Sequence, residues 1–144
     1  MGEEKLMHTS EVEVRYQETD QMGVVYHANY LVWFEIGRTK LIEQLGFTYK
    51  ELEEEGILLP VIDARLKYEQ PARYGDKIRI ETRIKEYKGV RLTFDYVIKN
   101  NKGDRLVTGY TTHSFVKAES FQPLRLRSVN KTWHRLIKSA SEGK

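Results

Sequence analysis

The pattern of hydrophobic and polar positions begins with one strand and one strongly apolar helix. Residues 11–16 alternate valine or tyrosine with charged residues, and this period of two predicts a strand with one solvated face. A helix is predicted from near His27 to Gln44 or Leu45, because apolar residues recur there at helical spacing. The residues before the strand, 1–9, are expected to form a loose end.

Four further strands are predicted later in the chain, where apolar and polar residues alternate between glycine-containing turns. They cover residues 58–69, 78–84, 92–98 and 105–116. A short surface helix capped by Thr48 precedes them, and Asn130 is a candidate cap for a final helix. We therefore predict an α+β fold: a curled antiparallel sheet of about five strands, the last four in a meander, wrapped around one long central helix.

Two glycines lie inside predicted elements. Gly37, within the long helix, costs about 1 kcal/mol relative to alanine. It is either simply tolerated or marks a place where another backbone packs closely. Gly109, within the last strand, predicts a bulge or a close approach to a neighbour.

Composition excludes several classes of protein. A chain of 144 residues with 40% hydrophobic and 31% charged residues is typical of one soluble domain, and no apolar run approaches the roughly 18 residues of a membrane span. Residues 1–10 lack the apolar core of a signal peptide, so a cytoplasmic protein is expected. The net charge of +3, with 24 basic residues among 21 acidic ones, argues against a nucleic-acid-binding protein.

The residue types also restrict the chemistry. Without cysteine there is no thiol nucleophile, disulfide or thiolate metal site, and four scattered histidines argue against zinc. No phosphate-binding glycine motif and no G-x-S-x-G motif occurs, which disfavours a serine hydrolase. We expect no metal and no redox cofactor.

One polar loop combines a carboxylate with the start of the apolar helix. Asp20 lies in this loop, a few residues before the helix. The first N–H groups of a helix are unpaired and carry partial positive charge, so they can stabilise an oxyanion that develops on a carbonyl. A carboxylate there can act as a general base or as a nucleophile. The alternative is an aspartate that merely caps a turn.

The same loop carries a resemblance to a known family. Residues Asp20 to Tyr30 read D-Q-M-G-V-V-Y-H-A-N-Y. They resemble the signature of hotdog-fold acyl-CoA thioesterases, the 4-hydroxybenzoyl-CoA thioesterase family, and most closely the branch with a histidine before Ala-Asn-Tyr. The resemblance covers roughly residues 12–116. It implies a single hotdog domain over residues 1–144, with a core at about 10–118 and a C-terminal helix at about 130–140.

The resemblance also implies an activity and an assembly. Members of this family hydrolyse thioesters, and coenzyme A is part of the substrate rather than a cofactor. Protomers pair into a continuous sheet as dimers or tetramers, with active sites at the subunit interface. Such pairing would protect the unpaired sheet edges of the protomer.

Catalytic roles follow from the same match. The resemblance places the catalytic carboxylate on Asp20 and turns the backbone N–H of His27 toward the thioester carbonyl. The imidazole of His27 either assists proton transfer or is structural. Glu35, inside the helix, is an alternative carboxylate, because a second branch of hotdog thioesterases places its base there. Glu18 is expected to be a solvated loop residue.

Substrate-binding candidates surround this centre. Gly23 is expected to let the backbone approach the ligand, Tyr26 to line an acyl pocket, and Asn29 to brace the start of the helix. Tyr30, Trp33 and Phe34 either line an aryl pocket or fill the core, and we favour the core.

The nucleotide end of coenzyme A requires cations, preferably forked arginine donors. The candidates are Lys88, Arg91 and Lys117, with a looser basic region at Arg125, Arg127, Arg135 and Lys138. Any one of them can instead be an ordinary solvated charge.

The favoured function is hydrolysis of short-chain, medium-chain or aromatic acyl-CoA to free acid and coenzyme A. Two alternatives stay open: an acyl-thioester dehydratase of the same fold, and a non-catalytic acyl-CoA-binding protein. A thioester of acyl carrier protein is also a possible substrate.

Overall fold

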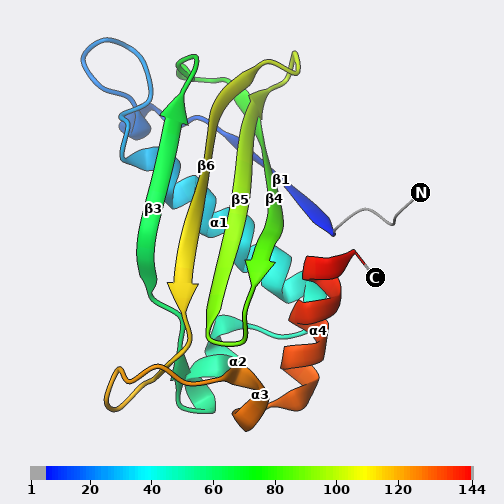
Figure 1. The fold of residues 1–144 in the computed structure, drawn as a ribbon. Coiled ribbons are helices and arrows are strands. Elements are labelled where there is room, and N and C mark those ends of the chain that lie inside the picture. The colour runs from blue at the N-terminus through cyan, green and yellow to red at the C-terminus, as the bar shows by residue number, and fades with distance from the viewer. Residues whose placement is uncertain (1–5, 144) are drawn as a thin grey trace.

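One long helix, α1 (Asn29–Leu45), lies against a five-stranded antiparallel sheet in the computed structural model, which describes residues 6–143 (Figure 1). The sheet strands are β1 (Met7–Glu13), β3 (Val61–Tyr68), β4 (Lys77–Tyr87), β5 (Arg91–Asn100) and β6 (Arg105–Ser114). Their order is β1-β4-β5-β6-β3. The predicted α+β architecture, with a sheet around a central helix, is confirmed.

The connectivity differs from the predicted meander at one strand. β4, β5 and β6 are joined by hairpins, but β3 pairs with β6, so that Val61 lies opposite His113 and Tyr68 opposite Val107. The segment after β3 therefore crosses the end of the sheet to reach β4 (Figure 1). Alternation along a strand shows which face is buried but does not specify its partner, which explains the error.

The core lies between α1 and the inner face of the sheet. Trp33 and Phe34 of α1 are at most 1% exposed, and the ring of Phe34 stacks on Tyr96 of β5 with centroids 4.0 Å apart. Burying one such side chain contributes about 1.5–3 kcal/mol. Tyr30 is buried as well, so the core interpretation of these three aromatic residues is confirmed. Leu31 and Val32 remain exposed on the opposite side of α1.

Both glycines mark close approaches. A Cβ atom on Gly37 would overlap Oγ1 of Thr82 on β4, so the close-packing interpretation is correct, although the neighbour is a side chain rather than a backbone. A Cβ atom on Gly109 would overlap the carbonyl oxygen of Arg65 on β3. These contacts let α1 and the edge strand lie close to the sheet.

The early part of the chain departs from prediction at two points. β1 begins at Met7, so the expected loose end is wrong for residues 7–9, while residues 1–5 lie outside the described part of the chain. Tyr16 belongs to a short 3-10 helix, η1 (Tyr16–Glu18), instead of the first strand. Alternation of residue types continues past the point where hydrogen bonding to β4 ends.

Shorter elements close the end of the sheet near the C-terminus of α1. α2 (Tyr49–Glu54) is capped by Thr48, whose Oγ1 accepts a hydrogen bond from the Glu51 N–H at 3.0 Å, as predicted. β2 (Ile57–Leu58) pairs with β7 (Val116–Lys117). The chain ends with α3 (Leu126–Val129), which was not predicted, and α4 (Lys131–Glu142). Asn130 caps α4 as expected, because its Oδ1 accepts from the Trp133 N–H at 2.9 Å.

Candidate active site

The loop between η1 and α1 is organised by one buried carboxylate. Oε1 of Glu18 accepts a hydrogen bond from the Arg15 N–H at 2.8 Å, and Oε2 accepts from Nε1 of Trp33 at 3.1 Å. The carbonyl oxygen of Glu18 accepts from the Tyr26 N–H at 2.8 Å and from Nδ2 of Asn29 at 2.9 Å. One residue thus ties both ends of the loop to the first turns of α1.

Glu18 corrects the sequence interpretation. It was expected to be solvated, yet it is 6% exposed and is fully engaged by neighbours. Glu18 is buried because the indole N–H of Trp33, itself buried, requires a hydrogen-bond acceptor, which the Glu18 carboxylate provides. The expected bracing role of Asn29 is confirmed by its bond to Glu18, while Ala28 occupies the N-cap position without a capping side chain.

Asp20 is half-buried in this loop and uses only one of its oxygens. Oδ1 accepts a hydrogen bond from the Met22 N–H at 2.8 Å, and the carbonyl oxygen accepts from the Gly23 N–H at 3.1 Å. Gly23 has φ +80°, a left-handed conformation that glycine adopts readily. Within residues 6–143, Oδ2 has no hydrogen-bond partner. The carboxylate therefore caps a turn and still presents a free oxygen.

His27 lies just outside α1, which begins two residues later than the predicted start. Its carbonyl oxygen accepts from the Tyr68 hydroxyl at 3.3 Å, and its ring lies 4.3 Å from the ring of Tyr26. Among the described residues, no hydrogen bond occupies the backbone N–H of His27 or of Ala28. Both His27 and Tyr26 are exposed, so this end of the helix is open to a ligand.

A small cavity of about 230 Å³ opens beside His27. It lies between the start of α1 and the end of β3, with Tyr30 and Tyr68 among its walls. The Tyr30 hydroxyl accepts a hydrogen bond from the Ala72 N–H at 3.1 Å; burial raises the pKa of Tyr30, and the Ala72 N–H lowers it. Asp20 and Tyr26 belong to the same loop but do not line this cavity.

Glu35 lines a different cavity, of about 470 Å³, near the start of β3. Arg38 and Thr39 follow Glu35 on the same side of α1, and Tyr49 of α2 faces them. The remaining walls are mostly apolar: Leu58, Leu59, Pro60 and Phe121, together with Glu53.

A buried polar chain runs near this second cavity. Nδ1 of His113 on β6 donates to the carbonyl oxygen of Leu59 at 3.0 Å, and Nε2 is hydrogen-bonded to Oγ1 of Thr111 at 2.8 Å. Burial lowers the pKa of His113 to about 4, against the opposing effect of the Leu59 carbonyl. Burial raises the pKa of Tyr96, which bonds Thr111 at 2.6 Å, and the nearby Arg38 guanidinium lowers it.

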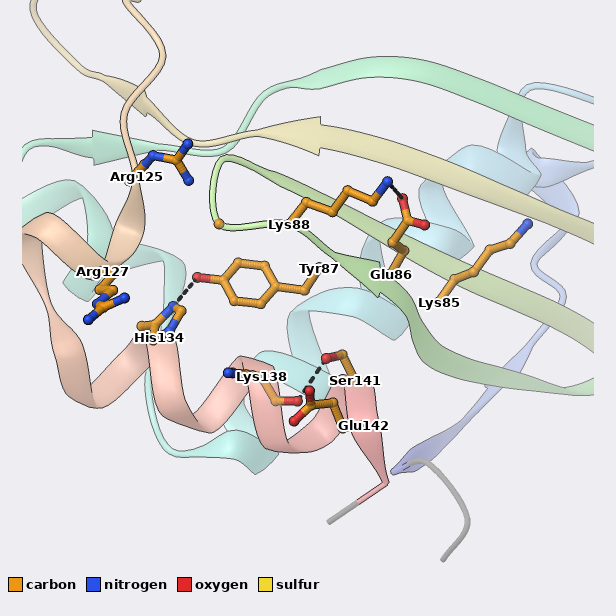
Figure 2. A pocket seen from close by; sticks show the side chains of 11 residues that line it. Lys85, Glu86, Tyr87, Lys88, Arg125, Arg127, His134, Lys138, Ser141 and Glu142 are labelled. Carbon is orange, nitrogen blue, oxygen red and sulfur yellow. Dashed lines mark hydrogen bonds and ion pairs between the residues drawn. The ribbon is translucent and has the colours of Figure 1, made fainter. Parts of the chain in front are cut away.

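The predicted cations do not meet at one place. Lys88 lines a cavity of about 630 Å³ together with Arg125, Arg127 and Lys138 (Figure 2), and the cavity lies toward the C-terminal end of α1 (Figure 1). Arg91 at the start of β5 and Lys117 in β7 are exposed and do not line it. Sequence reasoning had treated the later arginines as a looser group, because 37 positions (125 − 88) separate Lys88 from Arg125 in the chain.

Comparison with known proteins shows the family to which the chain belongs. Residues 14–133 match the thioesterase-like superfamily. The chain is 44% identical over 138 residues to the Bacillus subtilis protein YneP, whose name assigns it as a candidate acyl-CoA thioesterase; this covers 94% of this chain and 100% of that protein. The chain belongs to the thioesterase-like superfamily.

Solved structures give the same result. The DHNA-CoA thioesterase of Staphylococcus aureus superposes with a TM-score of 0.91 at 37% identity, over 96% of this chain and 95% of that one. A 1,4-dihydroxy-2-naphthoyl-CoA thioesterase of Synechocystis superposes with a TM-score of 0.83 at 22% identity, over 92% and 96% of the two chains. At this lower identity the likeness concerns the fold, and it confirms the hotdog fold.

None of the helices within residues 6–143 is both long and apolar enough to cross a membrane. No group of three or more histidine, aspartate or glutamate side chains in that range is arranged to hold a metal ion.

Proposed function

We propose that this protein hydrolyses acyl-CoA thioesters, with Asp20 as the catalytic carboxylate. The observation that carries the proposal is the free Oδ2 of Asp20 in the loop that leads into the open N-terminus of α1, in a chain of the thioesterase-like superfamily. Oδ2 either accepts a proton from the attacking water or attacks the thioester carbon itself. Both routes leave Oδ1 in its turn, where the Met22 N–H holds the carboxylate in one orientation.

The backbone at the start of α1 supplies the oxyanion site in this proposal. The N–H groups of His27 and Ala28 have no hydrogen-bond partner in the part of the chain that the structure describes, and they lie at the positive end of a helix of 17 residues. A thioester oxygen placed there gains negative charge in the transition state and is stabilised without proton transfer. The imidazole of His27 stays available to protonate the leaving thiolate, since the ring is exposed.

The site is proposed to be completed by a second copy of the chain. β3 is an edge strand with exposed Val61, Ile62 and Tyr68, each at least 46% exposed. Pairing of two β3 strands about a two-fold axis is antiparallel, so the Tyr68 end of one copy lies beside the Val61 end of the other. The small cavity at His27 then adjoins the larger cavity at Glu35 of the second copy, and we propose a dimer or a dimer of dimers.

The acyl group is proposed to enter the cavity at Glu35. Its apolar walls suit a short or aromatic acyl chain, while Glu35, Arg38 and Tyr49 offer polar groups to an oxygen substituent. Trp33 and Phe34 are buried in the core and line neither this cavity nor the small one at His27. Comparing benzoyl-CoA with 4-hydroxybenzoyl-CoA as substrates measures what these polar groups contribute.

Release of free thiol from a panel of acyl-CoAs tests the central claim. The chain has no cysteine, so a thiol reagent gives no background from the protein. Asp20→Asn keeps an Oδ1 acceptor for the Met22 N–H but loses the carboxylate, and we expect kcat to fall by roughly 100-fold to 10,000-fold. Asp104→Asn, in the exposed turn between β5 and β6, is the matched control and should retain full turnover.

Three outcomes would reject the proposal. Unchanged turnover in Asp20→Asn would remove Asp20 from the mechanism. Saturable binding of acyl-CoA without thiol release from any substrate would favour the non-catalytic binding protein. Consumption of a 3-hydroxyacyl thioester without thiol release would favour the dehydratase instead.

A further inference from the structure

One aromatic residue beside the cavity at Glu35 has a backbone conformation that its residue type disfavours. Phe121 has φ +59°, and among residues 6–143 it is the only residue other than glycine with a positive φ. A bulky side chain makes this left-handed region costly, whereas glycine and asparagine adopt it readily. Such strain persists only where the surrounding structure holds the residue in place.

Burial within the protomer does not offset this strain. The side chain of Phe121 is 58% exposed, and it belongs neither to the hydrophobic core nor to the described residues that pack against the core. A phenylalanine usually stabilises a fold by removing its ring from water. A ring that stays largely solvated gives the fold little of this stabilisation, so its position serves something other than the core.

Hydrogen bonds fix the turn that carries Phe121, at the same end of the sheet as α2 (Figure 1). The Phe121 N–H donates to the Lys117 carbonyl at 2.8 Å, and the Lys117 N–H donates to the Gln122 carbonyl at 2.9 Å. The Ala118 N–H donates to the Gly56 carbonyl at 2.9 Å, which joins the turn to the segment before β2. The ring of Phe121 therefore projects from a fixed support.

Phe121 lines the cavity of about 470 Å³ at Glu35. Leu58, Leu59 and Pro60 form the rest of the apolar wall, and each of them is less exposed than Phe121. A side chain that lines a cavity while more than half of its surface stays in solvent lies at the rim. Phe121 thus narrows the cavity without filling it.

A fixed aromatic ring at the rim of an apolar cavity limits what the cavity can hold. Overlap with a ring that cannot retreat costs more than the burial of one further methylene group gains. We propose that Phe121 sets the upper size of the acyl group accepted at Glu35, a role that rests on the proposed function. Acyl groups that end before the ring bind, and longer aliphatic chains are excluded.

Phe121 and the Asp20 loop contribute to one site from different copies of the chain. In the proposed two-fold dimer, the cavity at Glu35 of one copy adjoins the small cavity at His27 of the other. Asp20 acts at the thioester carbon, whereas Phe121 of the neighbouring copy acts on the far part of the acyl group. A substitution at Phe121 therefore changes which acyl group is accepted and leaves the Asp20 loop intact.

Calorimetric titration with two thioether analogues of acyl-CoA tests this role without turnover. S-hexyl-CoA and S-decyl-CoA lack the thioester carbonyl, so they cannot be hydrolysed. We expect Phe121→Ala to shift the ratio of the two Kd values by roughly 10-fold in favour of the decyl analogue, relative to the wild type. Phe121→Trp, which enlarges the ring system, should shift the ratio in the opposite direction.

Two further variants separate the ring from the backbone and from exposed apolar surface in general. Asparagine tolerates the left-handed conformation, so Phe121→Asn should unfold at a higher urea concentration than Phe121→Ala and give the same Kd ratio. Val129→Ala shortens an exposed apolar side chain of α3 that does not line the cavity, and it should leave the ratio unchanged.

An unchanged Kd ratio in both Phe121→Ala and Phe121→Asn would overturn the proposal. An equal shift in Val129→Ala, or no saturable binding of either analogue by the wild type, would overturn it as well. Thiol release from hexanoyl-CoA and decanoyl-CoA is measured beside binding. A shifted Kd ratio without thiol release from either thioester would support the size limit and reject the thioesterase assignment, so the two failures are distinguishable.

Discussion

The Asp20 loop and the basic cavity lie at opposite ends of α1 and satisfy their charges in different ways (Figure 1). In the loop, the Glu18 carboxylate is buried and bonded at both oxygens, and Oδ2 of Asp20 has no hydrogen-bond partner within residues 6–143. In the basic cavity, which Lys88 also lines, Arg125, Arg127 and Lys138 have no acidic partner among the described residues. The loop is thus held in one conformation by its own hydrogen bonds, whereas the charges of the cavity are not balanced in this way.

Removing the Glu18 contacts that hold the Asp20 loop should have the largest effect on the free energy of unfolding. Glu18→Ala leaves the Arg15 N–H and the Trp33 indole N–H without their acceptor, and two hydrogen bonds to a charged group contribute about 3 kcal/mol or more. We expect the free energy of unfolding in urea to fall by that amount. Turnover should fall with it, because the loop that carries Asp20 loses its anchor.

Glu18→Gln is the informative control for this change. An amide retains one acceptor oxygen of the same shape, so about half of the loss should be recovered. A cost below about 1 kcal/mol for Glu18→Ala would mean that the buried contacts do not hold the loop.

The contrast also explains what could be predicted from the sequence. The Asp20 loop is continuous in the chain, so its turn residues and the apolar helix that follows can be recognised together from the sequence. The burial of Glu18 was missed, because a glutamate in a polar stretch looks solvated until its acceptor role for Trp33 is known. Strand faces followed from alternation, but the pairing of β3 with β6 depends on contacts between distant segments.

The basic cavity was only partly predictable for the same reason. Its residues were named as candidate phosphate ligands, but Lys88 was grouped with Arg91 and Lys117, which lie elsewhere. The hydrogen bond between the Leu126 N–H and the Gly89 carbonyl brings the later arginines to the β4–β5 hairpin. No local sequence pattern predicts this bond. Non-local contacts decide which charges share a site.

His113, a buried residue whose two ring nitrogens are both hydrogen-bonded, should have an effect of intermediate size on stability. His113 is 1% exposed, and burial lowers its pKa to about 4 in the folded protein, while an unfolded histidine titrates near 6.5. Between these values the unfolded chain binds the extra proton, so stability falls as pH decreases from about 6.5 toward 4. The shift corresponds to about 3 kcal/mol, an order-of-magnitude figure.

His113→Gln removes this titration. We expect the free energy of unfolding of the variant to depend less on pH over that interval than the wild type does, whatever its stability at neutral pH. His8→Gln, which removes a histidine from β1, controls for the loss of any histidine. Identical slopes for the wild type and His113→Gln would show that another group governs acid unfolding.

The smallest expected effect is a gain in the free energy of unfolding, and it concerns variants of the basic cavity. If Arg127 and Lys138 repel each other and Arg125, then Arg127→Gln/Lys138→Gln should stabilise the protein by a few tenths of a kcal/mol up to about 1 kcal/mol at low salt. The gain should vanish near 1 M salt, where charges are screened within about 3 Å. Urea unfolding at low and high salt measures both effects, with Lys50→Gln/Lys102→Gln as the control. A loss of stability at low salt, confined to the cavity variant, would mean that these cations are satisfied within the fold, as Glu18 is, and the two ends of α1 would no longer differ in kind.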